Sequence, residues 1–331
     1  MAALLRRVFN RARDVLYVPP LDPVWRRQLQ GKVICLLYHR VDQPGRFPFL
    51  DRFGVPPMMP MDLGHELAFL KSQGADFLTF SDLRRGHFPG RDQFGVIVSF
   101  DDCLADTYRQ ATGVLEWLGI PGVLFQTTGL LDAPTLIWEH SLYWHAHHPE
   151  HSQALSQLAH ERIPASRGLE GDALVRHLRS ATPMPEVEAL LAEASERAGV
   201  GAELASLAAE LYPKAVDLKG AFASGHEIAS HGHHHYPRES LTDAAFEAEL
   251  QRSSELIAAA VGKPPRAFSY PFNSHQSGDA AICARHYWQV ATVEARLISH
   301  DTPRLEIPRC TWPGPIRNPR QFRRWLWSGH L

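Results

Sequence analysis

The sequence predicts an α/β protein with parallel strands and a long helical insertion. Short apolar runs alternate with segments of helical spacing over residues 33–127 and again over 225–293, which is the pattern of parallel βαβ units. Between these regions, residues 132–220 are dominated by Ala, Glu, Leu, His and Arg and carry helical periodicity. The length of 331 residues allows one large domain or two modest ones.

The individual elements follow from local patterns. Apolar runs predict strands at 33–38, 77–80, 95–100, 123–127, 227–230, 267–270 and 289–293. The spacing of aliphatic residues predicts helices at 62–74, 107–118, 187–194, 202–211 and 243–261. The last of these helices follows a cap-like segment, 240–243, and is stopped by Gly-Lys-Pro-Pro at 262–265.

The composition excludes some classes of protein. Lys and Arg total 34 against 36 Asp and Glu, so the chain has no basic bias and we expect no nucleic-acid partner. The four cysteines lie far apart without CxxC spacing, which indicates buried thiols more than a disulfide framework. The 19 histidines are unusual, and those at 231–235 are clustered closely enough to suggest a metal site.

Both ends of the chain combine basic and apolar residues. Residues 1–30 contain a basic amphipathic segment, and 317–331 form a basic-aromatic tail. One interpretation is peripheral contact with an anionic membrane surface, and the other is a helix docked on the body of the protein. No run of 18 apolar residues occurs, and the amino end lacks the apolar core of a signal peptide. We therefore expect a cytoplasmic protein, with the inner membrane face as an alternative location.

The strongest indication of chemistry is a strand that ends in two carboxylates. The apolar run 96–100 is followed by Asp101 and Asp102, which repel each other unless a cation lies beside them. His231 and His235, four residues apart, could hold that cation as a metal ion. Two histidines and one carboxylate form a common ligand set with open positions, so Asp102 is the natural third ligand. Asp101 would then lie beside the metal-bound water and could accept its proton.

Three motifs occur in an order that points to a known family. They are Ser-Phe-Asp-Asp-Cys at 99–103, Ser-Gly-His-Glu-Ile-Ala-Ser-His-Gly-His-His-His at 224–235, and Phe-Ser-Tyr-Pro-Phe-Asn at 268–273. Together they resemble the polysaccharide deacetylase family (carbohydrate esterase family four). The resemblance implies a distorted (β/α) barrel over 31–316, interrupted by the helical insertion at about 133–221.

The resemblance also implies roles for the strand-end residues. Asp102, His231 and His235 would bind one divalent metal, and Asp101 would be the general base. Zinc suits these nitrogen and oxygen ligands, and cobalt, nickel or iron are alternatives. The backbone around Phe272 would help to stabilise the oxyanion.

Departures from the family pattern concern three further positions. Cys103 replaces a glycine after the Asp pair, so the turn there must differ or accept a β-carbon. Ser269 stands where many members carry an arginine that orients the catalytic aspartate, and Arg309 is expected to supply that charge instead. The general acid of the family is a late histidine, which His300 matches in sequence. The alternative is that the segment around His300 is a loop with no catalytic role.

Two further positions belong to the expected substrate region. Tyr270 lies in the third motif beside Phe272 and is expected near the oxyanion. His39 follows the first strand, and its alternatives are a neighbour of the reacting group and a structural histidine at the barrel rim.

These expectations converge on a metal-dependent hydrolase that removes the N-acetyl group from an amino sugar in a glycan or glycan precursor. Its substrate would be a nucleotide-linked, lipid-linked or oligomeric sugar. The alternatives are a deformylase or other small-amide hydrolase on the same site, and an inactive sugar-binding or scaffold barrel. The helical insertion is expected to cover the barrel mouth; its aromatic opening, 138–144, fits either a sugar subsite or a helix core.

Overall fold

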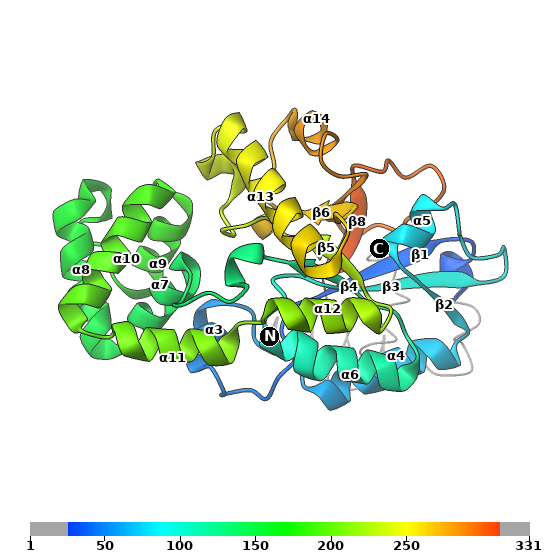
Figure 1. Ribbon diagram of the computed structural model, residues 1–331, viewed down its shortest axis with the longest axis horizontal. Helices are drawn as coiled ribbons and strands as arrows, with labels where there is room; N and C mark the ends of the chain where they lie inside the picture. Colours follow the sequence, from blue (N-terminus) through cyan, green and yellow to red (C-terminus); the bar gives the residue numbers. More distant parts are fainter. Residues whose placement is uncertain (1–25, 312–331) are drawn as a thin grey trace, which may run out of the picture.

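The computed structural model describes residues 26–311, which form a closed barrel of parallel strands with helices around it (Figure 1). Strand β1 pairs with β3 on one side and with β8 on the other, and this closes the ring. The prediction of a distorted (β/α) barrel is confirmed. The barrel strands are β1 (Val33–Tyr38), β3 (Phe94–Phe100), β4 (Val123–Gln126), β5 (Glu227–Ser230), β6 (Ala267–Ser269), β7 (Gln289–Val293) and β8 (Ile307–Thr311).

The distortion is concentrated at β3. Strand β1 runs along one edge of β3, so the two remaining neighbours share the other edge. Strand β2 (Ala75–Leu78) pairs with residues 94–97 of β3, and β4 pairs only with 99–100. The sequence places β2 two residues too late. Thr79 in fact caps the short helix α5 (Phe80–Arg84), because its side chain accepts a hydrogen bond from the Asp82 N–H.

The strands bury both faces. Every residue of β1 and β3 is buried, as expected for parallel strands covered on two sides. One core fills the barrel interior, and a second lies between the barrel and its outer helices. The main outer helices are α4 (Pro60–Ser72), α6 (Thr112–Leu118), α12 (Ala215–Ala223) and α13 (Asp243–Val261); α14 (Asp279–Cys283) is shorter.

The helical insertion gathers at one end of the molecule, at the left of Figure 1. Its helices share a hydrophobic core of their own, to which α3 (Pro48–Phe53) also contributes. By contrast, Leu218 and Ala221 of α12 pack in the barrel's outer core. The insertion helices are α7 (Trp138–His147), α8 (Pro149–Arg162), α9 (Gly171–Ser180), α10 (Met184–Ala198) and α11 (Gly201–Leu211).

The ends of the chain carry predictions that lie beyond the described part. The expected basic-aromatic tail, 317–331, and all but the last five residues of the expected amphipathic segment, 1–30, are outside residues 26–311. Within 26–311, no helix has the length and hydropathy needed to cross a membrane. All four cysteines are buried free thiols, as the sequence predicts.

A buried carboxyl group on α4 makes the stability of the barrel dependent on pH. Tyr38 Oη donates to Glu66 Oε2 at 3.3 Å, while Oε1 has no hydrogen-bond partner among the described residues. Burial raises the pKa of Glu66 from 4.5 to about 9. At neutral pH the carboxyl is therefore protonated in the folded chain and ionised in the unfolded chain. Unfolding therefore releases a proton, which lowers the free energy of unfolding. This loss is absent below the pKa of Glu66 in the unfolded chain and grows as the pH rises toward its pKa in the folded chain.

Glu66→Gln is expected to remove this loss, because glutamine resembles the protonated acid. The free energy of unfolding should rise by roughly 4–5 kcal/mol near pH 8, at about 1.4 kcal/mol for each pH unit above the unfolded pKa, and stay unchanged near pH 4. Urea denaturation at the two pH values measures the difference, with Glu150→Gln on the surface of α8 as the control. Equal gains at both pH values would contradict the pKa assignment.

Candidate functional site

The site lies at the mouth formed by the carboxyl ends of the strands. Strand β3 ends at Phe100, and the Asp101 N–H donates to Tyr38 O at 3.0 Å. The next two residues, Asp102 and Cys103, have φ of 63° and 53°. This left-handed turn, which costs roughly 1–2 kcal/mol per residue, sends the two carboxylates in different directions. Cys103 is fully buried in the outer core, so the turn accepts its β-carbon.

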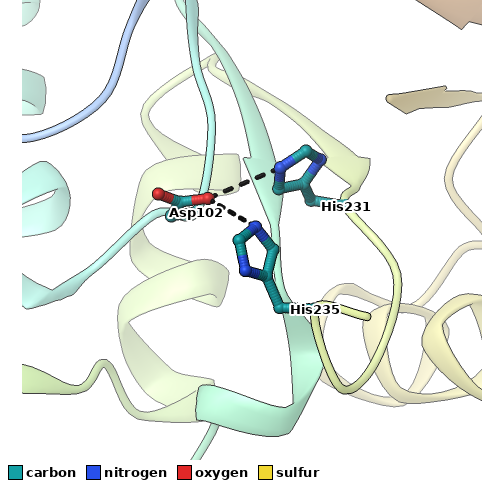
Figure 2. Close-up of side chains that lie close together, drawn as sticks. All are labelled: Asp102, His231 and His235. Carbon is teal, nitrogen blue, oxygen red and sulfur yellow. Dashed lines mark ion pairs between the residues drawn. The ribbon is translucent and has the colours of Figure 1, made fainter. Parts of the chain in front are cut away.

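Asp102 meets two histidines that follow β5 (Figure 2). Asp102 Oδ1 lies 3.4 Å from His231 Nε2 and 3.1 Å from His235 Nε2. One ligand atom from each of the three residues lies within 4.8 Å of the others. The structure therefore brings together the three residues predicted as metal ligands.

The remaining ring nitrogens show that this set fits a metal ion. His231 Nδ1 lies 2.9 Å from the carbonyl oxygen of Ser269, which can only accept, and 2.6 Å from the Ser269 hydroxyl, whose own hydrogen can go to Asp101 Oδ1. A hydrogen on Nδ1 satisfies all of these contacts. His235 Nδ1 lies 2.7 Å from Glu139 Oε2 in the same way. Both Nε2 atoms therefore point toward Asp102. With a metal ion bound there in place of a hydrogen, they would match metal-binding histidines whose other nitrogen is held by a carbonyl or carboxylate.

The electrostatics of His235 also favour a cation. Burial alone would lower its pKa, but the carboxylates of Glu139 and Asp102 outweigh burial and raise the pKa to about 10. The pKa of Asp102 is in turn held well below its usual value: burial opposes this, and His235 and His231 outweigh burial. The carboxylates of Asp102 and Glu139 therefore favour a positive charge beside the two imidazoles. Either protons or a divalent ion can supply that charge.

Asp101 faces a different partner. Arg309, on β8, projects into the barrel interior and donates Nη1 to Oδ1 at 2.5 Å and Nη2 to Oδ2 at 2.7 Å. Burial would raise the pKa of Asp101, but the Arg309 guanidinium outweighs it, so the pKa is lowered. Ser269 Oγ adds a contact to Oδ1 at 3.4 Å. Arg309 thus lies where the resemblance expects an orienting arginine, although it comes from a different strand.

A cavity of about 310 Å³ opens above these residues. It is enclosed by strand ends on one side and by the insertion on the other. Its charged and polar lining comprises His39, Arg40, Asp101, Asp102, Glu139, His140, Tyr143, Arg179, His231, His235, Tyr270, Asn273 and Thr311. The insertion therefore supplies one wall of the site, and its predicted role as a cover over the mouth stays a prediction.

Three of the other predicted residues, His39, Tyr270 and Phe272, line the cavity. The Phe272 ring lies 4.6 Å from the His235 ring. The hydroxyl of Tyr270, however, lies 3.4 Å from Cys283 Sγ in the core beside α13. The roles predicted for these three residues remain predictions.

His300 does not reach the site. Two residues before it, Ile298 forms a pair of backbone hydrogen bonds with Val33, the first residue of β1. This places His300 at the amino end of the barrel, opposite the metal ligands, where its exposed ring lies 4.0 Å from Phe88. The expectation that His300 is the general acid is therefore wrong, and the loop interpretation of this segment holds.

Several site residues were not predicted individually, although three of them lie in the segment 138–144, for which a sugar subsite was one of the two interpretations. Glu139, His140 and Tyr143 come from α7, and Arg179 comes from α9. Tyr143 Oη donates to Glu139 Oε1, and Arg179 Nη1 donates to Tyr143 Oη at 3.0 Å. The available signals were the aromatic residues of 138–144 and, among them, the carboxylate of Glu139, which needs a hydrogen-bond partner if it is buried.

Glu139→Gln is expected to weaken divalent metal binding by roughly 10–100-fold, because the charged acceptor that orients His235 is lost. Isothermal titration with Zn²⁺ would measure this. Glu188→Gln is the matched control: Glu188 also lies in the insertion but accepts from Tyr236 instead of a ligand. Unchanged affinity in Glu139→Gln would show that the insertion does not support the metal ligands.

The polysaccharide deacetylase family model matches residues 192–286, a segment that contains His231 and His235 but not the Asp pair. No curated protein sequence matches the chain. Solved structures resemble it over most of its length.

Three of these structures illustrate the likeness. A polysaccharide deacetylase from Bacillus cereus has 17% identity and a TM-score of 0.54 over 85% of this chain, which spans 65% of that protein's length. IcaB from Ammonifex degensii has 17% identity and a TM-score of 0.55, covering 90% of this chain and 97% of its own. The deacetylase PplD from Streptococcus pyogenes, solved with acetate, has 15% identity and a TM-score of 0.56, covering 86% and 93%. At these identities the likeness establishes the fold.

Proposed function

Since the chain carries a polysaccharide deacetylase segment and has the fold of that family, we propose that it is a metal-dependent hydrolase that removes an N-acetyl group from an amino sugar. The observation that carries the proposal is the convergence of Asp102, His231 and His235 at the barrel mouth, beside Asp101. The fold neighbour from Streptococcus pyogenes binds acetate, the acid that such a reaction would release.

Asp102, His231 and His235 would hold one divalent ion, which would polarise the amide carbonyl and acidify a water molecule. Zinc is our first choice, and cobalt, nickel or iron suit the same ligands. Asp101 is the proposed base, since Oδ2 lies 3.8 Å from His231 Nε2 and so borders the same space.

Arg309 sets both the position and the basicity of Asp101. Its fork holds the carboxylate plane through two hydrogen bonds, which prevents rotation of the side chain. The same contacts keep Asp101 ionised at neutral pH and ready to receive a proton at one oxygen.

The proposed substrate is an N-acetylated amino sugar carried on a nucleotide, a lipid or an oligomer. A cytoplasmic location, with contact at the inner membrane face through the chain ends, belongs to the same proposal. Both parts rest on the sequence pattern of the ends and on the sugar class of the family.

The decisive experiment combines metal stoichiometry with product analysis. The full chain is titrated with Zn²⁺ and then incubated with N-acetylated sugar oligomers and a nucleotide-linked N-acetyl sugar, and the released acid is identified. One bound equivalent and acetate release support the proposal. Formate release from formylated analogues alone would favour the deformylase alternative, and absence of specific metal binding would favour a sugar-binding barrel.

A further inference from the structure

The wall that the insertion adds to the cavity contains a histidine outside the ligand set. His140, on α7, is buried and lines the cavity opposite the strand ends. His140 Nδ1 lies 2.8 Å from Tyr212 Oη, a residue that follows the last helix of the insertion. Tyr212 Oη also accepts the Ile137 N–H at 2.9 Å. This pair of contacts determines which nitrogen of His140 carries its hydrogen.

The hydroxyl group of Tyr212 has one hydrogen to donate. The backbone N–H of Ile137 can only donate, so it occupies an acceptor position on the oxygen. If His140 Nδ1 donated as well, the Tyr212 hydrogen would be buried without an acceptor, at a cost of about 1–3 kcal/mol. The hydroxyl therefore donates to Nδ1, and the hydrogen of the neutral ring lies on Nε2.

His140 Nε2 has no hydrogen-bond partner within residues 26–311. Because the ring lines the cavity and Nδ1 is taken by Tyr212, Nε2 is the atom available to a bound molecule. We propose that His140 is a neutral hydrogen-bond donor to an oxygen of the substrate, supplied by the insertion to a site whose metal ligands come from the barrel. The identity of that substrate rests on the proposed function, whereas the donor geometry does not.

The surroundings of His140 keep its ring neutral. Burial lowers its pKa to about 4; Glu139 and Asp102 oppose this, and His235 and Arg40 add to it. A general acid would begin as an imidazolium, so the structure separates donation of a hydrogen bond from donation of a proton. A neutral imidazole that polarises a carbonyl through N–H is a known catalytic device.

The tautomer can be tested without a substrate. Long-range ¹⁵N–¹H spectra of the full chain labelled at histidine distinguish Nε2–H, Nδ1–H and imidazolium rings. The His140 signals are those missing from His140→Gln. We expect the Nε2–H form from about pH 5 to pH 8, and a loss of this preference in Tyr212→Phe. An Nδ1–H ring or an imidazolium in this range would overturn the proposal.

Contact with a ligand can be tested with acetate as the probe. Acetate should shift the Nε2–H resonance of the Zn²⁺-loaded chain, and absence of any shift at saturating acetate would count against a cavity-facing donor. The control is His145→Gln, since His145 lies on the same helix but bonds to Ser195 away from the cavity. The shift should persist in this variant.

Activity then separates this inference from the proposed function. His140→Phe should lower kcat/KM for acetate release by about 10²-fold, while His140→Gln, which keeps an N–H donor, should lose about tenfold or less. His145→Gln should match the wild type. If acetate is released and His140→Phe is fully active, the inference fails alone. If no N-acetylated sugar is hydrolysed but the tautomer and acetate shift are as expected, the proposed function fails and the donor remains.

Discussion

The Asp101→Asn variant is expected to lose turnover by roughly 10²–10⁴-fold while still binding one divalent ion, whereas Asp102→Ala should lose the ion itself. The physical reason is the division of the two carboxylates by the left-handed turn at Asp102 and Cys103. One carboxylate faces the two Nε2 atoms, and the other faces the guanidinium of Arg309.

The measurement pairs Zn²⁺ titration with acetate release for both variants. Asp101→Asn leaves the buried charge of Arg309 without a full counter-charge, so circular dichroism must first establish that each variant is folded at the assay temperature. If both variants bind metal equally and retain equal activity, the proposed roles of the two aspartates are wrong. If Asp101→Asn loses metal as completely as Asp102→Ala, Asp101 would be a ligand and not the base.

Arg309→Met is expected to have the largest effect on stability, a loss of about 3–5 kcal/mol in the free energy of unfolding. Arg309 and Asp101 are both almost completely buried, at 1% and 4% exposure, and two hydrogen bonds join them. Removing the guanidinium leaves a carboxylate inside the barrel without its main donor. The pKa of Asp101 should then rise, because burial is no longer opposed by Arg309.

Urea denaturation of Arg309→Met measures this loss. The double variant Asp101→Asn with Arg309→Met removes both charges, and it should be more stable than Arg309→Met alone. Arg309→Lys keeps the charge without the planar fork, so an intermediate stability is expected. A loss below about 1 kcal/mol in Arg309→Met would show that water or another cation compensates Asp101.

The barrel could be predicted from the sequence because its strands are buried on both faces. The run 33–38 is continuously apolar, and 95–100 is interrupted only by Ser99, a pattern that is typical of buried parallel strands in an α/β chain. Strand β8 escaped prediction because Ile-Pro-Arg-Cys-Thr contains a proline and an arginine. Arg309 points into the barrel and pairs with Asp101. The charged residue that obscures the strand pattern in the sequence is therefore part of the site.

The site was predictable where its residues follow strands and unpredictable where they come from elsewhere. Asp102, His231 and His235 lie at strand ends, and parallel strands bring such ends to one edge. Glu139 and His140 reach the cavity from α7, which belongs to a separate core. No periodicity in a sequence shows that one helix of an insertion returns to the barrel. His300 illustrates the converse error, since a matching motif at the wrong end of a barrel cannot take part.

The way the insertion leaves and re-enters the barrel has a consequence for the order of folding. Strands β4 and β5 are neighbours, yet residues 127–226 separate them along the chain. At the base of the insertion, the Asp132 N–H donates to Pro213 O at 3.2 Å, and the Ala215 N–H donates to Asp132 Oδ2 at 3.3 Å. Once folded, the insertion therefore holds its two ends side by side.

When the insertion is folded, its two ends lie close together, so β4 and β5 are in effect joined by a short connection. Closing a loop costs conformational entropy that increases with its length, and pairing of distant strands is slow for this reason. Most residues of the core around α7–α11 come from the insertion itself, so forming this core before β4 and β5 pair would need few contacts from the barrel. Early collapse of α7–α11 would then reduce the entropy lost when the ring closes, so the segment that completes the cavity would also speed assembly of the barrel.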